Sequence, residues 1–282
     1  MQGALGPGHP LEVTGAELVC LAVAQVLLRF NDERHWLRCA PVLVGHLFPR
    51  LLSQSEYHRR LRGAGDLMEA AVRWLAARTA ARHDTVRLWD GTAVPCGASR
   101  QTAQRSGLFG WAGYGVDKSH HRFCWGVELM LVCAPDGLVT GFALVNPKLV
   151  KERDAMRMMF AWEKNRPRPG ATGVCDKGFA GAGFEAGMAQ LGITVVRPAR
   201  KDESDPGTFP HGLRQRVESV HWTLKGQLGL ETRGGRVLSG LWARVLQRLL
   251  ALNAAIWHNW ACRADRKRSL IPYDHPTRLT ST

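Results

Sequence analysis

Three acidic side chains occupy segments from which carboxylates could meet at one point. Asp90 interrupts an apolar, β-branched run (84–95) that predicts a strand, where an isolated acid is unfavourable unless it is paired or coordinates a cation. Asp176 directly follows a second predicted strand, and Glu218 lies in the middle of a predicted helix. Because Mg²⁺ is a hard cation that prefers oxygen ligands, these carboxylates predict metal-assisted phosphodiester chemistry.

Two basic residues share the predicted helix face of Glu218. Arg214, Glu218 and Lys225 fall at positions i, i+4 and i+11, which places all three on one stripe of a helix. This face therefore offers a carboxylate ligand between two cations that can bind DNA phosphates. Further basic residues, each either a DNA contact or ordinary solubilising surface charge, are Lys177, Arg200, Lys201 and Arg216.

Each acid also has a simpler interpretation when it is taken alone. Asp90 and Gly91 form an Asp-Gly pair, which is common in turns. Asp176 could be a turn residue at the end of its strand, and Glu218 could be a solvent-facing residue paired with Arg214 one helical turn away. The three acids together, each in a suitable element and in this order, favour a shared metal site.

The segments that carry these acids belong to a pattern of alternating strands and helices. Runs of β-branched and aromatic residues predict five strands, and a turn cluster at 135–137 predicts an antiparallel hairpin between the second and the third. Helices precede the last two strands, as parallel pairing requires. The predicted class is α/β, a ribonuclease H-like mixed five-stranded sheet flanked by helices. The predicted strands span 84–95, 123–133, 138–145, 171–175 and 193–197, and the predicted helices span 152–162, 183–191, 213–225 and 237–260.

The N-terminal part of the chain predicts a small helical bundle, roughly residues 12–82. Thr14 with Glu17 and Ser53 with Glu56 form two capping boxes, which satisfy the exposed amides at a helix start. The bundle is either a helix-turn-helix DNA reader or a structural cap. The predicted domains are an N-terminal helical domain that could bind DNA (1–82), a catalytic domain (83–262) and a basic tail (263–282).

Two features beside the first predicted strand stay open. The segment 97–118 is rich in Gly, Ser and basic residues and predicts a long loop, which is either a mobile surface loop or a clamp on DNA. His120 and His121 could suggest a metal site, but neighbouring residues in a strand point to opposite faces. We therefore expect these histidines to be exposed or satisfied by other partners.

The charge balance indicates a polyanionic partner. The chain of 282 residues carries 38 Lys and Arg against 24 Asp and Glu, a formal net charge of +14, which attracts nucleic acid and, as the alternative, anionic lipid. The longest apolar run near the N-terminus, 16–28, is interrupted by Glu17 and Gln25 and is shorter than the ~20 residues of a membrane span. We expect no membrane segment, no signal peptide and a cytoplasmic protein that associates with the nucleoid when it is bound to DNA.

Three sequence blocks carry a resemblance to a known family. They are LWDGTAVP (88–95), GVCDKGF (173–179) and RQRVESVHWTLKG (214–226), and they resemble the three catalytic blocks of bacterial insertion-sequence transposases with a DDE triad. The order of the predicted elements is similar across roughly residues 12–260. The resemblance therefore covers most of the chain.

The resemblance implies a role for each matched residue. Asp90, Asp176 and Glu218 become the catalytic ligands of two Mg²⁺ (or Mn²⁺) ions, while Arg214 and Lys225 become DNA-phosphate contacts. One position departs from the pattern. Many relatives have a tyrosine three residues before the arginine, where this chain has His211, so the role of that position stays open.

The activity that the resemblance implies is metal-dependent strand cleavage and strand transfer of an insertion sequence. The expected partner is double-stranded DNA, both the terminal inverted repeats of the element and the target DNA, and the expected active form is a homodimer. Two alternatives remain: a DNA nuclease of the same fold that cleaves without joining, and a domesticated DNA-binding protein without catalysis.

Overall fold

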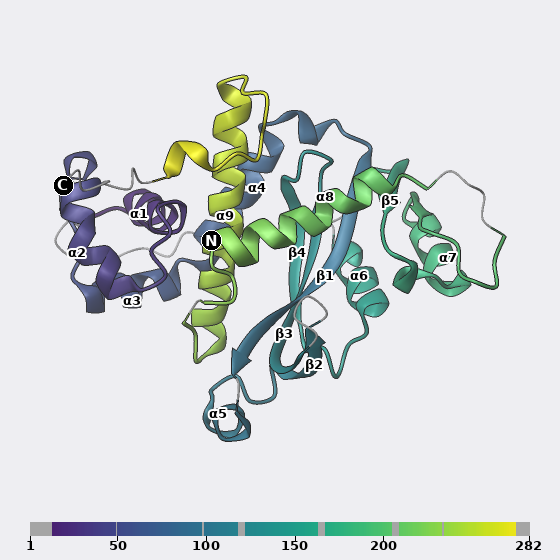
Figure 1. Ribbon diagram of the computed structural model, residues 1–282, viewed down its shortest axis with the longest axis horizontal. Coiled ribbons are helices and arrows are strands. Elements are labelled where there is room, and N and C mark those ends of the chain that lie inside the picture. The colour runs from purple at the N-terminus through teal and green to yellow at the C-terminus, as the bar shows by residue number, and fades with distance from the viewer. Residues whose placement is uncertain are drawn as a thin grey trace, which may run out of the picture.

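The structure is a computed structural model that describes residues 13–48, 50–97, 99–117, 122–162, 167–204, 209–232 and 234–274. His120 and His121 lie outside the described residues, as do the two ends of the chain. Across the described residues a sheet stands in the middle of the molecule with helices on both of its faces (Figure 1). This arrangement confirms the predicted α/β fold with a mixed, ribonuclease H-like sheet.

In the part of the chain that the structure describes, the sheet has six strands rather than the predicted five. Its strands follow the order β2-β3-β1-β5-β6, and β4 pairs with β3 beside β2. β3 and β4 form the predicted antiparallel hairpin, and β1, β5 and β6 pair in parallel as predicted. The strands are β1 (Val86–Gly97), β2 (Gly113–Asp117), β3 (Arg122–Cys133), β4 (Val139–Val145), β5 (Ala171–Val174) and β6 (Ile193–Val196).

The additional strand β2 corrects the prediction of one long loop at 97–118. Ser99 accepts a hydrogen bond from the backbone of Thr102 and begins a short helix, α5 (Arg100–Arg105). β2 then pairs along β3. Two of its five residues, Gly113 and Gly115, are glycines with low strand propensity. Pairing to β3 rather than local preference therefore decides its conformation.

Alternation along β3 divides the core between the two faces of the sheet. Leu129 and Leu131 belong to a buried cluster with the N-terminal helices and the long helix α9 (Leu238–Ala261). Met130 and Val132 belong to a second cluster with the helices α6 (Glu152–Ala161) and α7 (Ala182–Gln190). Because successive side chains of a strand point to opposite faces, both faces of this central strand are apolar and each needs a layer of helices.

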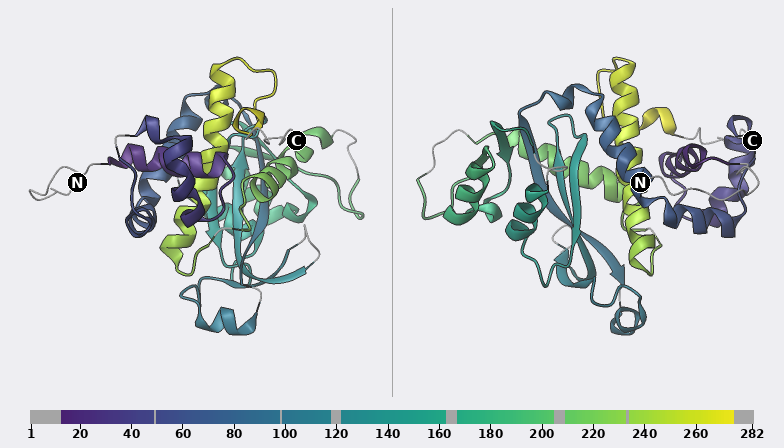
Figure 2. Two further views of the ribbon diagram at one scale, coloured as in Figure 1. Left: turned by 60° about the vertical axis from the view of Figure 1, so that its left-hand side comes forward. Right: turned by 180° about the vertical axis from the view of Figure 1, so that it is seen from behind.

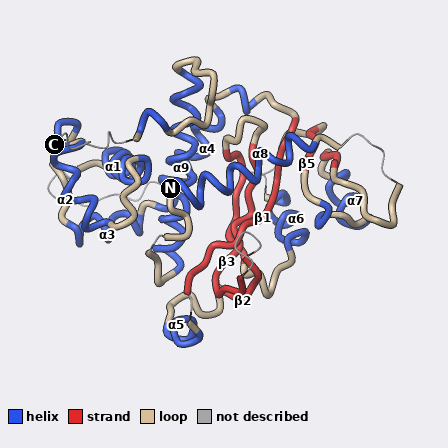
Figure 3. The backbone as a smooth tube through the Cα atoms, in the orientation of Figure 1, coloured by secondary structure: helices blue, strands red, loops and turns tan. Residues whose placement is uncertain are grey.

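The helices form these two layers on either side of the strands, as Figure 2 and Figure 3 show. On one side lie α6 (Glu152–Ala161) and α7 (Ala182–Gln190). On the other side lies α9, with the N-terminal bundle packed against it. The bundle comprises α1 (Gly15–Leu27), α2 (Glu33–Leu43), α3 (Gln54–Gly63) and α4 (Gly65–Ala77).

The N-terminal bundle begins as the sequence predicts. The complete capping box of Thr14 and Glu17 is present at α1, and Ser53 accepts a hydrogen bond from the backbone of Glu56 at α3. The bundle and α9 share one continuous core with a face of the sheet. Whether residues 1–82 fold as a separate domain stays a prediction.

The helix that covers β1 departs from a regular α-helix at its end. It runs as α8 (His211–Trp222) and continues as a π-helical turn (Thr223–Gln227). Such π turns are rare and frequently occur at functional sites. Among the described residues, no helix has both the length and the apolar character needed to cross a membrane.

Candidate active site

Asp90 lies on β1, and Asp176 follows the end of the neighbouring parallel strand β5. Leu88 of β1 pairs with Val174 of β5, and each aspartate lies two residues further along its own chain. β1 pairs with β5 only from Val86 to Leu88, because β5 ends at Val174. β1 therefore continues past the end of β5 at the position of Asp90. The end of β5 therefore brings Asp176 to the edge of β1 beside Asp90.

Glu218 reaches the same region from α8. Leu88, Val174 and Val217 form a small buried cluster between the two strands and this helix. Leu88 and Asp90 lie two residues apart on β1 and share its face. Because Glu218 directly follows Val217, packing of this cluster holds the helix carboxylate over the face of β1 that carries Asp90.

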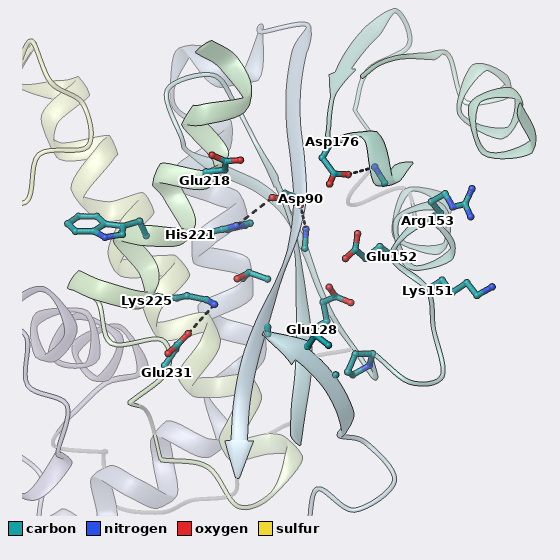
Figure 4. A pocket seen from close by; sticks show the side chains of 18 of the residues that line it. Asp90, Glu128, Lys151, Glu152, Arg153, Asp176, Glu218, His221, Lys225 and Glu231 are labelled. Atoms are coloured by element: carbon teal, nitrogen blue, oxygen red, sulfur yellow. Dashed lines mark hydrogen bonds and ion pairs between the residues drawn. The ribbon is translucent and has the colours of Figure 1, made fainter. Parts of the chain in front are cut away.

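The three carboxylates line one cavity of about 920 Å³. Figure 4 shows Asp90 between Glu218 on one side and Asp176 on the other. The cavity is richer in acid than the sequence predicts, because β3, α6 and the segment after α8 each add a glutamate. These additional acids are Glu128, Glu152 and Glu231.

The three predicted ligands make hydrogen bonds or ion pairs within the chain. Asp90 accepts from the backbone N–H of Gly91 at 2.9 Å, and Asp176 accepts from that of Gly178 at 2.8 Å. Glu218 pairs with Arg214 at 3.0 Å. Over the described ranges, no three His, Cys, Asp or Glu side chains are grouped closely enough to hold a metal ion. The oxygen donors suit Mg²⁺ or Mn²⁺ in kind, and binding requires their side chains to converge.

Of the simpler interpretations of the three acids, two agree with the structure and one does not. Asp90 is not in a turn, because it lies within β1 and pairs with Leu131 of β3. Asp176 does cap a short 3₁₀ turn that begins at Lys177. Glu218 does pair with Arg214, and its side chain is about half exposed, at 51%. The last two arrangements are compatible with a metal site, since both residues also line the cavity.

His221 belongs to the site and was missed from the sequence. Its Nδ1 atom lies 3.8 Å from Oδ2 of Asp90, its side chain is 11% exposed, and its Nε2 atom is buried without a hydrogen-bond partner. Burial, and after it the positive charge of Lys225, lower the pKa of His221 to about 3, so the imidazole is neutral at neutral pH. The feature of the sequence that could have identified His221 is its position one helical turn after Glu218.

Lys225 lines the cavity but is not free to meet DNA in this structure. It lies in the π-helical turn, only 9% of its side chain is exposed, and its ammonium group is 3.0 Å from Glu231. The predicted stripe of Arg214, Glu218 and Lys225 does face one cavity. A phosphate contact by Lys225 stays a prediction, and it requires the ammonium group to leave Glu231.

The other basic residues predicted to bind DNA follow the ends of β5 and β6. Lys177 and Lys201 are exposed. The Arg200 guanidinium donates to the carbonyl oxygen of Ala180 at 2.9 Å, and Arg153 donates to the same oxygen at 2.7 Å. Arg200 therefore holds the segment that follows Asp176, and its predicted contact with DNA stays untested, like those of the two lysines.

Comparison of the whole structure with solved structures identifies the fold. A piggyBac transposase synaptic complex with hairpin DNA matches 97% of this chain and 71% of that chain, with a TM-score of 0.52 at 10% sequence identity. The fold is transposase-like. The Mos1 strand transfer complex and a pre-cleavage Mos1 transpososome match at TM-scores of only 0.33 and 0.27, with 11% and 13% identity, each covering 95% of this chain and 82% of the other, and add no support. No protein-family model and no curated protein sequence matches the chain.

Proposed function

We propose that this protein is a DNA transposase of the insertion-sequence type that cleaves and joins strands with Asp90, Asp176 and Glu218 as its metal ligands. The observation that carries the proposal is the position of these carboxylates. They come from β1, from the segment that follows β5 and from α8, and they line one cavity in a transposase-like fold. Oxygen ligands from separate elements are what two-metal phosphodiester chemistry needs.

The cofactor of this proposal is a pair of Mg²⁺ or Mn²⁺ ions. Held by Asp90, Asp176 and Glu218, such ions would activate the attacking water or 3′-hydroxyl and would stabilise the leaving oxygen. Asp90 contributes the most fixed ligand, because it lies within a strand paired to β3. Glu218 contributes the most adjustable one, since its side chain is on an exposed helix surface.

Arg214 links metal binding to DNA binding in this proposal. Its guanidinium group now pairs with Glu218, and both side chains are substantially exposed, at 39% and 51%. When the Glu218 carboxylate turns to a cation, Arg214 loses this partner and becomes available for a DNA phosphate. The same helix thereby positions a metal ligand and a contact to the substrate backbone.

The proposed partner is double-stranded DNA, comprising the terminal inverted repeats of the element and its target. The net charge of +14 supports this choice, as does the presence of DNA in the piggyBac complex that the fold matches. A homodimer that holds two DNA ends is the proposed active form. The proposed location is the cytoplasm, with association to the nucleoid through DNA.

A strand-transfer assay tests the proposal. Duplexes made from the DNA on either side of the gene, with or without a precut 3′-hydroxyl end, are incubated with the protein, a target plasmid and Mg²⁺ or Mn²⁺. The proposal predicts both nicking and joining, and loss of both in Asp90→Asn, Asp176→Asn and Glu218→Gln with DNA binding retained. Nicking without joining supports the nuclease alternative. Binding without nicking supports the domesticated protein.

A further inference from the structure

His221 is a buried polar side chain for which packing alone gives no account. It lies on α8 between Glu218 and Lys225 and is 11% exposed. Its Nε2 atom is buried and makes no hydrogen bond, which costs free energy that an apolar side chain of similar size would not cost. The imidazole must therefore contribute a contact, and its nearest charged neighbour is the carboxylate of Asp90.

The geometry fixes which ring nitrogen carries a hydrogen. Nδ1 of His221 faces Oδ2 of Asp90 at 3.8 Å, as Figure 4 shows. A carboxylate offers only acceptor atoms, so Nδ1 must be the donor. The separation exceeds a hydrogen bond by about 1 Å, so the bond requires one of the two side chains to rotate.

Asp90 is thus approached from two sides. Its Oδ1 atom accepts from the backbone N–H of Gly91 at 2.9 Å, while its Oδ2 atom faces His221. Its side chain is 24% exposed, and the residue lines the cavity.

We propose that His221 is a positioning residue, which donates its Nδ1–H to Asp90 and holds that carboxylate in the orientation that binds a divalent cation. The inference rests on the proposed function, because it assigns His221 to the metal ligand Asp90. Hydrogen-bonding partners of metal ligands typically contribute 10- to 100-fold to metal affinity. His221 itself does not touch the substrate or the cation.

The test measures Mn²⁺ binding to the full-length protein. The electron paramagnetic resonance signal of free Mn²⁺ gives the amount that is not bound. His221→Leu removes the N–H donor and puts an apolar side chain of similar size in its place. This variant should weaken Mn²⁺ binding about 10-fold or more. His221→Asn keeps an N–H near the position of Nδ1 and should restore most of the affinity. His258→Leu, an exposed histidine on α9, is the matched control and should bind Mn²⁺ as the wild type does.

The outcomes separate the two proposals. Weak binding by His221→Leu with recovery in His221→Asn supports the inference. Wild-type affinity in His221→Leu, or equal losses in both variants, overturns it. If Asp90→Asn and Glu218→Gln leave the affinity unchanged, the proposed function fails instead. Circular dichroism verifies folding of each variant, and His221→Met replaces His221→Leu if the leucine variant does not fold.

Discussion

Asp90 and Asp176 line the same cavity, and each follows, by two residues, a member of the Leu88–Val174 pair of parallel strands. This relationship places two acids at one end of β5, where β1 continues beyond its neighbour. α8 then lies over the same face and adds Glu218. The proposed site therefore depends on strand register and on one small apolar cluster.

Arg214 is expected to contact one DNA phosphate. Arg214→Ala should weaken DNA binding and lower the slope of log affinity against log salt by about one. Stability should change by less than about 1 kcal/mol, because the pair with Glu218 is exposed. Fluorescence anisotropy at several salt concentrations measures the slope. The control is Arg216→Ala, which removes the same charge from the same helix. The Arg216 guanidinium donates to the Pro135 carbonyl oxygen, so this variant should leave the slope unchanged. Equal slopes in both variants would count against the assignment of Arg214.

The Lys225–Glu231 pair decides between a structural role and a DNA contact. Because both side chains are largely buried, at 9% and 17% exposed, Lys225→Met should lower the free energy of unfolding by about 3 kcal/mol. The double variant Lys225→Met, Glu231→Leu should recover part of this loss. Urea denaturation measures both. Unchanged stability together with a salt slope lowered by about one would show that Lys225 meets DNA instead.

Gly173 is required by the close approach of Trp89. A Cβ atom at Gly173 would lie 1.6 Å from the ring of Trp89, a fully buried side chain. Gly173→Ala should therefore lower the free energy of unfolding by about 3 kcal/mol or more. In a Trp89→Leu background the same alanine should cost much less, and a double-mutant cycle from urea denaturation measures the difference. Equal costs in the two backgrounds would mean that the ring does not limit the packing.

Acid should loosen the segment after β6. Hydrogen bonds from the Arg197 side chain and then the Arg200 backbone hold the pKa of Glu203 near 2, below its ordinary value of 4.5. The unfolded chain thus takes up this proton at a higher pH than the folded protein does. The stabilisation is present above pH 4.5 and is lost as the pH falls towards 2. The melting temperatures of wild type and Glu203→Gln should converge over that range, and a gap that stays constant would contradict this origin.

The sequence predicts those parts of the site that depend on local pattern. The strand around Asp90, the strand end at Asp176 and the β3–β4 hairpin all follow from β-branched runs and a Pro-Asp-Gly turn. Cap residues likewise predict the start of α1, because Thr14 and Glu17 are neighbours along the chain.

Features that depend on tertiary contacts were missed. β2 contains two glycines and is a strand because β3 pairs with it. The π-helical turn changes the direction of Lys225, which then meets Glu231 in the following segment. His221 becomes part of the site only when α8 packs on β1. Helical periodicity alone gives neither the partner nor the depth of these side chains.

The most direct test of the metal site is anomalous X-ray scattering from crystals of the protein grown with Mn²⁺ and a DNA duplex. The account predicts two Mn²⁺ peaks among the carboxylates of Asp90, Asp176 and Glu218, with the Glu218 side chain turned away from Arg214. Peaks held instead by Glu128 or Glu152, which line the same cavity, or the absence of Mn²⁺ from this cavity, would contradict it.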